Sequence, residues 1–174
     1  MSNVIMIIAP EKFRDEELFE TKEILEERGH TITIASTKKG TCKGMLGRTA
    51  DAEIILNDVH WHNFDAVIFV GGSGTELLYN NKEAIRIAQE MHTKGKLVAA
   101  ICLAPVILAN AGLLKGVNAT VYETAIKMIQ NKGALYTGTG VTVDENIVTA
   151  NGPQSAKAFG QQIAVLLESI LHHV

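Results

Sequence analysis

Short apolar runs typical of buried strands alternate along the chain with longer stretches whose apolar residues recur at helical spacing. The runs predict strands at 4–9, 31–35, 65–70, 97–101 and 146–150, with weaker strands at 54–56, 119–121 and 138–143. The periodic stretches predict helices at 14–28, 81–94, 105–111, 123–131 and 154–171, the last with an apolar face of Phe159, Ile163, Leu166, Leu167 and Ile170. We interpret 38–48, rich in Gly and Lys, as an exposed loop or short ribbon. The strand–helix–strand order predicts an α/β fold with a parallel sheet and right-handed crossovers.

A tight turn between the strand at 97–101 and the next helix carries the most informative residue, Cys102. Pro105 fits the first helical position, where its missing N–H has no helical partner. The small residues Ala100 and Ala104 lie two positions to either side of Cys102, as a nucleophile elbow requires. The free N–H groups of the helix start favour a thiolate, so we expect a low pKa for Cys102. The alternative for such a residue is a buried structural cysteine.

Two further loops follow strands at the same expected edge of the sheet. Residues 71–76, Gly-Gly-Ser-Gly-Thr-Glu, follow the strand at 65–70, and the N–H of Gly72 could form an oxyanion hole with that of Leu103. The glycines match neither dinucleotide-binding nor P-loop spacing, and Glu76 would repel phosphate, which disfavours nucleotide binding. An acidic helix start follows the first strand, and its position one loop from Cys102 makes Glu17 or Glu16 a candidate acid.

Composition narrows the class of protein. Of 174 residues, 47% are hydrophobic and 20% charged, which excludes a disordered chain. A net charge of −3 argues against a nucleic-acid partner, and the run at 4–9 is too short for a signal peptide or a membrane span. Cys42 and Cys102 lie far apart, and His60 and His62 have no evident third ligand, so we expect neither a disulfide nor a metal. We expect one cytoplasmic domain over residues 1–174, with no membrane partner.

Nearly the whole chain resembles the ThiJ/PfpI superfamily, the DJ-one family with a class I glutamine amidotransferase-like fold. The resemblance rests on the segments FRDEEL at 13–18, FDAVIFVGG at 64–72, AAICLAP at 99–105 and VDENIVT at 143–149. It implies a flavodoxin-like three-layer sandwich, with a mostly parallel central sheet and helices on both faces.

The resemblance also implies residue roles. Cys102 matches the nucleophile, and Glu17 matches a buried, usually protonated glutamate that donates a hydrogen bond to the sulfur. Gly72 and Leu103 match the oxyanion-hole amides. Two further positions match substrate-pocket or cross-subunit residues of PfpI-type peptidases, Glu76 and Tyr122, which implies a homodimer or higher homo-oligomer.

One departure from the family pattern decides between activities. PfpI-type peptidases have His directly after the nucleophile, whereas this chain has Leu103. General acid–base catalysis is typically worth about 10²–10⁴-fold, so its loss disfavours peptide hydrolysis. We therefore expect glyoxalase III-like or deglycase-like action on reactive carbonyl compounds in stress protection, with no metal or other cofactor.

Two alternatives stay open. One is a cysteine peptidase or amidase with an incomplete triad, acting on a peptide-like substrate. The other is a non-enzymatic redox sensor or chaperone that uses an oxidisable Cys102.

Overall fold

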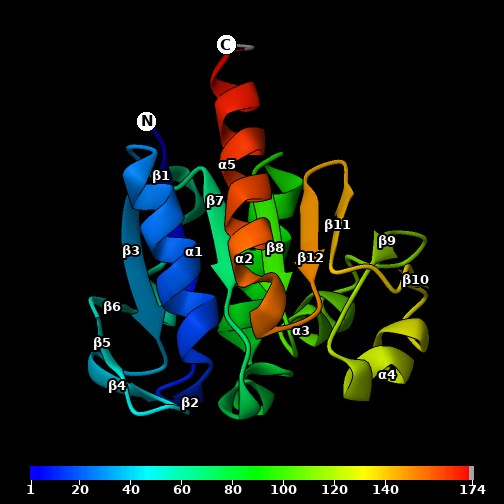
Figure 1. Cartoon of the computed structure of the whole chain (residues 1–174), viewed down its shortest axis with the longest axis horizontal. Coiled ribbons are helices and arrows are strands. Elements are labelled where there is room, and N and C mark those ends of the chain that lie inside the picture. Colours follow the sequence, from blue (N-terminus) through cyan, green and yellow to red (C-terminus); the bar gives the residue numbers. More distant parts are fainter. Residues whose placement is uncertain (173–174) are drawn as a thin grey trace.

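The computed structural model describes residues 1–172, with side chains described as far as residue 169. The side chain of Ile170, expected on the apolar face of the last helix, therefore lies outside the described residues. Seven strands form the central sheet in the order β11-β12-β8-β7-β1-β3-β6 (Figure 1). Their bounds are β1 Asn3–Ile7, β3 Thr31–Ser36, β6 Ile54–Ile55, β7 Ala66–Phe69, β8 Leu97–Ile101, β11 Val141–Asp144 and β12 Ile147–Ala150.

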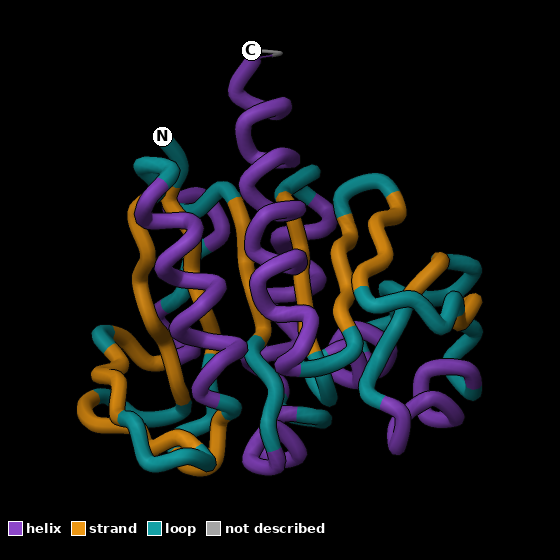
Figure 2. Tube along the Cα trace, viewed as in Figure 1, coloured by secondary structure: helices purple, strands orange, loops and turns teal. Residues whose placement is uncertain are grey.

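The sheet is parallel at every pairing except that of β11 with β12, which form an antiparallel hairpin. Helices cover both faces, as Figure 2 shows. On one face lie α1 Asp15–Glu27 and α5 Ala156–His172, and on the other lie α2 Lys82–Thr93 and α3 Pro105–Asn110. The expected flavodoxin-like α/β fold is confirmed. Within residues 1–172, no helix combines the length and apolar character needed to cross a membrane.

Alternation along the strands builds the two hydrophobic cores. Ile5 and Ile7 of β1 face the layer of α2 and α3, whereas Val4 and Met6 face the layer of α1 and α5. All four side chains are fully buried. Burial on both faces explains why these strands are continuous apolar runs.

Most predicted elements are present with ends shifted by a few residues. The segment 38–48 contains β4 Gly40–Gly44, which pairs with two strands not predicted from sequence, β2 Glu11–Phe13 and β5 Thr49–Ala52. A second small sheet pairs β9 Asn118–Ala119 with β10 Leu135–Tyr136. The remaining helices are α4 Ile126–Gln130 and the 3-10 turns Leu56–Asp58, Trp61–Asn63, Ser73–Leu78, Glu123–Ala125 and Pro153–Ser155.

The strand expected at 138–143 begins only at Val141. A cluster of hydroxyl hydrogen bonds replaces strand pairing before that residue: Thr137 and Thr139 each contact Thr142, at 2.6 and 2.8 Å. Side-chain hydrogen bonds of this kind offer the backbone an alternative to the sheet.

Candidate active site

Cys102 lies in the turn between β8 and α3, at the carboxyl edge of the parallel strands. Its φ of 65° is in the left-handed region, which a non-glycine residue adopts only where the surroundings impose it. Two backbone hydrogen bonds do so: Cys102 N–H donates to the carbonyl of Ala150 at 2.8 Å, and Tyr122 N–H donates to the carbonyl of Cys102 at 2.9 Å. Ala100 and Ala104 are fully buried against the turn. The elbow geometry predicted from these small residues is present.

Two backbone amides point at the sulfur of Cys102. The N–H groups of Gly72 and Leu103 lie close enough to it to oppose the rise in the pKa of the thiol that burial causes. Gly72 has a φ of 115°, and a Cβ at this position would lie 2.5 Å from the backbone nitrogen of Arg14. Only glycine therefore fits this turn, and an oxyanion hole formed by the two amides stays a prediction.

Glu17 of α1 is fully buried beneath the same turn. Its Oε1 accepts a hydrogen bond from the N–H of Gly71 at 2.9 Å, whereas its Oε2 is buried with no hydrogen-bond partner among the described residues. Burial raises the pKa of Glu17 to about 8, so the carboxyl is largely protonated at neutral pH. A protonated Oε2 has a hydrogen to donate, and the thiol of Cys102 interacts closely enough with this carboxyl to shift its pKa.

The electrostatics of Cys102 differ from the expectation of a low pKa. Burial of the sulfur and the negative charge of an ionised Glu17 together raise the pKa of Cys102 to about 12, against the opposing effect of the two amides. The helix start alone is therefore not sufficient to ionise this thiol. Because the effect of Glu17 depends on its charge, a proton on Glu17 removes that contribution.

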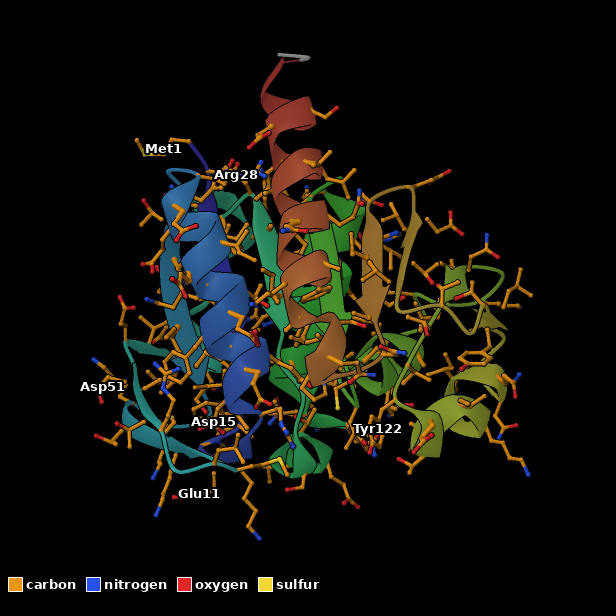
Figure 3. The ribbon with its side chains drawn as sticks, in the orientation of Figure 1. Met1, Glu11, Asp15, Arg28, Asp51 and Tyr122 are labelled. Atoms are coloured by element: carbon orange, nitrogen blue, oxygen red, sulfur yellow. The ribbon has the colours of Figure 1, made fainter. Side chains whose placement is uncertain are left out.

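A cavity of about 350 Å³ opens above the sulfur, a size that suits a small molecule. It is lined by Arg14, Met45, Gly72, Ser73, Cys102, Leu103, Tyr122, Pro153 and Gln154. Tyr122, which Figure 3 labels, thus lies where the resemblance implies a pocket residue. Glu76 is not among the lining residues: it is exposed on the turn Ser73–Leu78. Burial, and then the negative charge of Glu76, raise the pKa of Tyr79.

Sequence reasoning missed the lining residues Arg14 and Met45. Arg14 precedes α1, and its guanidinium forms a two-point ion pair with Glu16, at 2.9 and 3.0 Å. Glu16 thus binds Arg14 beside the cavity, and it is Glu17 that reaches the thiol. The sequence feature that could have identified Arg14 as a cavity residue is its position directly before the acidic residues that begin α1.

Met45 lines the cavity because hydrogen bonds to Asp15 hold the turn that carries it. Buried Asp15 accepts hydrogen bonds from the N–H groups of Leu46 and Arg48, both at 2.9 Å. The N–H of Ser73 in turn approaches the Met45 sulfur at 3.4 Å. No local pattern indicates these contacts, because they join residues about 30 positions apart.

Comparison with known proteins places this geometry in a family. The model of the DJ-1/PfpI family matches residues 2–166. A solved structure of a ThiJ/PfpI domain protein from Brachyspira murdochii superposes with a TM-score of 0.95, at 35% identity over 96% of each chain.

Curated relatives carry different names. An uncharacterized protein of Methanocaldococcus jannaschii is 44% identical over 96% of this chain and 83% of its own. Deglycase PfpI of Pyrococcus furiosus is 34% identical over 94% of this chain and 99% of its own. The Bacillus subtilis protein YraA, named as a candidate cysteine protease, is 30% identical over 97% of this chain and all of its own.

Proposed function

The chain belongs to the DJ-1/PfpI family, and we propose that it is a cysteine-dependent enzyme that converts small reactive carbonyl compounds by glyoxalase III-like or deglycase-like chemistry. Cys102 is the nucleophile and Glu17 the proton carrier. The observation that carries the proposal is the pairing of an elbow cysteine with a buried, protonated carboxyl, in a cavity whose described lining includes no histidine. The name of the deglycase relative from Pyrococcus furiosus supports the same class of reaction.

The chemistry follows from these groups. For methylglyoxal, the sulfur of Cys102 adds to the aldehyde carbon, and the N–H groups of Gly72 and Leu103 stabilise the negative oxygen that forms. Protonation of that oxygen gives a hemithioacetal. Glu17, left as a carboxylate once it has protonated that oxygen, then moves the proton of the former aldehyde carbon to the neighbouring carbonyl carbon, while the hydroxyl proton passes to the neighbouring oxygen, giving a thioester of Cys102. Water hydrolyses the thioester, which releases lactate and restores the thiol, with no external oxidant or reductant.

The proton on Glu17 has a second purpose in this scheme. At neutral pH the protonated carboxyl adds no negative charge beside the sulfur and has a hydrogen to donate. Ionisation of the thiol therefore costs less free energy beside this neutral acid than beside a carboxylate, and the two backbone amides stabilise the thiolate that reacts.

Peptide hydrolysis is a second candidate, supported by the name of the Bacillus subtilis relative. It needs an acid to protonate the leaving amine, and Leu103 supplies none. A role as a redox sensor is the third candidate, because a thiolate that attacks carbonyls is also readily oxidised.

Turnover of methylglyoxal by the purified protein tests the proposal. Wild type is expected to release lactate, and Cys102→Ser is expected to release none above the buffer rate. Cys42→Ser is the matched control, because Cys42 is buried in the small sheet away from the cavity lining and its loss should leave turnover unchanged. Equal rates for wild type and Cys102→Ser would refute the proposed function.

A further inference from the structure

The charge of the cavity points to a narrower class of substrate. Arg14 is the one permanently charged side chain among the cavity-lining residues in the described part of the chain. The remaining side chains of the lining are polar or apolar, apart from the thiol of Cys102. A single guanidinium in a small cavity of this kind is the arrangement that orients an anionic ligand.

The backbone of Arg14 is fixed relative to the sulfur. Its N–H donates to the carbonyl of Gly71 at 2.8 Å, in the turn that presents the N–H of Gly72 to Cys102. The backbone that carries the guanidinium is thus hydrogen-bonded to the turn beside the nucleophile. An anionic group held by Arg14 would lie at a set distance from the carbon that Cys102 attacks.

The guanidinium has one edge occupied and one edge free. Nε and Nη2 donate to the two carboxylate oxygens of Glu16. Within residues 1–169, Nη1 donates no hydrogen bond, which leaves the Nη1–Nη2 edge available. This edge offers two parallel N–H groups, which match a carboxylate or phosphate. Glu16 holds the guanidinium in position, and its own negative charge partly offsets the positive charge of Arg14.

We propose that Arg14 selects carbonyl substrates that carry a carboxylate or phosphate group, and that Glu16 positions it. This inference rests on the proposed function for the carbonyl part of the substrate. Anion recognition by Arg14 does not depend on it, because Arg14 and Cys102 line the same cavity whatever reagent enters it.

Alkylation of Cys102 by two matched reagents tests anion recognition without requiring turnover. Iodoacetate and iodoacetamide react identically: a bond forms from sulfur to the CH₂ carbon, iodide leaves, and the thiol proton goes to buffer. They differ only in charge. The measured quantity is the ratio of their rate constants at Cys102, followed by mass spectrometry and divided by the same ratio for glutathione.

We expect this ratio to exceed one in wild type. In Arg14→Met it should fall about tenfold, because a charge-assisted hydrogen bond to the anionic reagent is lost. Arg28→Met is the matched control: Arg28 also pairs with a glutamate, Glu168, at 2.9 Å, but lies at the opposite end of α1 from Asp15 (Figure 3). Glu16→Gln should raise the ratio, because it removes the charge that opposes Arg14. This increase should be absent when Arg14→Met is combined with Glu16→Gln, because without the guanidinium the loss of the Glu16 charge leaves no group to hold the anion. A ratio near one that neither Arg14→Met nor Glu16→Gln changes would overturn the inference.

A second experiment tests the substrate class. 4,5-Dioxovalerate and 2-oxopentanal share the same keto-aldehyde group and chain length, and only the first carries a carboxylate. We expect kcat/KM to be about tenfold higher for 4,5-dioxovalerate, and this preference to vanish in Arg14→Met. Turnover of both compounds at equal efficiency, unchanged by Arg14→Met, would refute the inference and leave the proposed function standing. Turnover of neither compound, with the alkylation ratio still dependent on Arg14, would refute the proposed function and leave the anion site standing.

Discussion

Glu17 in α1 accepts a 2.9 Å hydrogen bond from the N–H of Gly71, the residue directly before the glycine whose own N–H points at Cys102. One backbone turn therefore connects the acid to the thiol. A change at Glu17 acts on Cys102 through two effects that can be separated, its charge and its ability to exchange a proton.

Glu17→Gln should separate these two effects. Glutamine keeps a hydrogen-bond donor and an acceptor for Gly71 but carries no charge and relays no proton. Because the charge of ionised Glu17 raises the pKa of Cys102, the variant should alkylate faster than wild type with iodoacetamide above pH 8. Its turnover of methylglyoxal should nevertheless fall, by about 10²-fold or more for a lost acid–base group. Rates measured from pH 6 to 10 check both expectations.

Glu17→Leu is the companion variant, since it removes the donor as well as the charge. It should alkylate more slowly than Glu17→Gln. Full turnover in Glu17→Leu would show that Glu17 is not the proton carrier.

The same carboxyl predicts how stability depends on pH. The pKa of Glu17 is about 8 in the folded protein against 4.5 as the reference value, so the folded state retains a proton that the unfolded state releases. Folding is therefore penalised increasingly as pH rises from about 4.5 to 8, to on the order of 4 kcal/mol. The free energy of unfolding of Glu17→Gln minus that of wild type should be larger at pH 8 than at pH 5, as measured by urea unfolding. A difference in unfolding free energy that is the same at both pH values would contradict the buried, protonated carboxyl.

Gly72→Ala should damage the site far more than a comparable change elsewhere. Gly72 and Gly112 both have positive φ, at 115° and 79°, but only at Gly72 would a Cβ meet other atoms, at 2.5 Å from backbone groups. Gly112→Ala should cost about 1–2 kcal/mol for the backbone conformation alone. Gly72→Ala should cost clearly more and abolish turnover, because the turn must move and take its N–H away from Cys102. Urea unfolding and methylglyoxal turnover of both variants check this, and equal costs would show that the turn adapts freely.

The central layer of the fold was predictable because local patterns dictate it. Continuous apolar runs mark strands buried on both faces, and the run 97–101 matches β8 residue for residue. Pro105 begins α3 as predicted, and the small residues around Cys102 identified the elbow. In each case neighbouring residues in the sequence determine the structure.

The cavity walls were less predictable because distant segments form them. Arg14 and Met45 acquire their positions from contacts with Gly71 and Ser73, in a different loop. Asp15 resembled an ordinary acidic helix start, yet it is buried and holds the turn that carries Met45. The pKa of Cys102 was predicted in the wrong direction because burial outweighs the helix start, and burial is a property of the folded protein.

Leu103→His tests what separates this chain from a peptidase. Leu103 lines the cavity next to Cys102, so a histidine there places an imidazole within reach of the nucleophile. It should raise hydrolysis of a fluorogenic peptide amide at least tenfold, a part of the about 10²–10⁴-fold that acid–base catalysis typically contributes. Leu103→Gln, polar but without a proton to exchange, should give no gain. If Leu103→His gives none either, the peptidase alternative should be dropped.

The same variant tests the predicted role of Glu76 across a subunit boundary. Glu76 is exposed and does not line the cavity of its own chain, so we predict that it orients the introduced imidazole from a partner copy. We expect sedimentation at micromolar concentration to show at least a dimer, and Glu76→Ala to cancel much of the hydrolysis gained by Leu103→His. Lys82→Ala, a charge change just beyond the same turn, is the control and should preserve the gain. A purely monomeric protein, or a gain that Glu76→Ala leaves intact, would show that Glu76 acts only on its own chain, beside Tyr79.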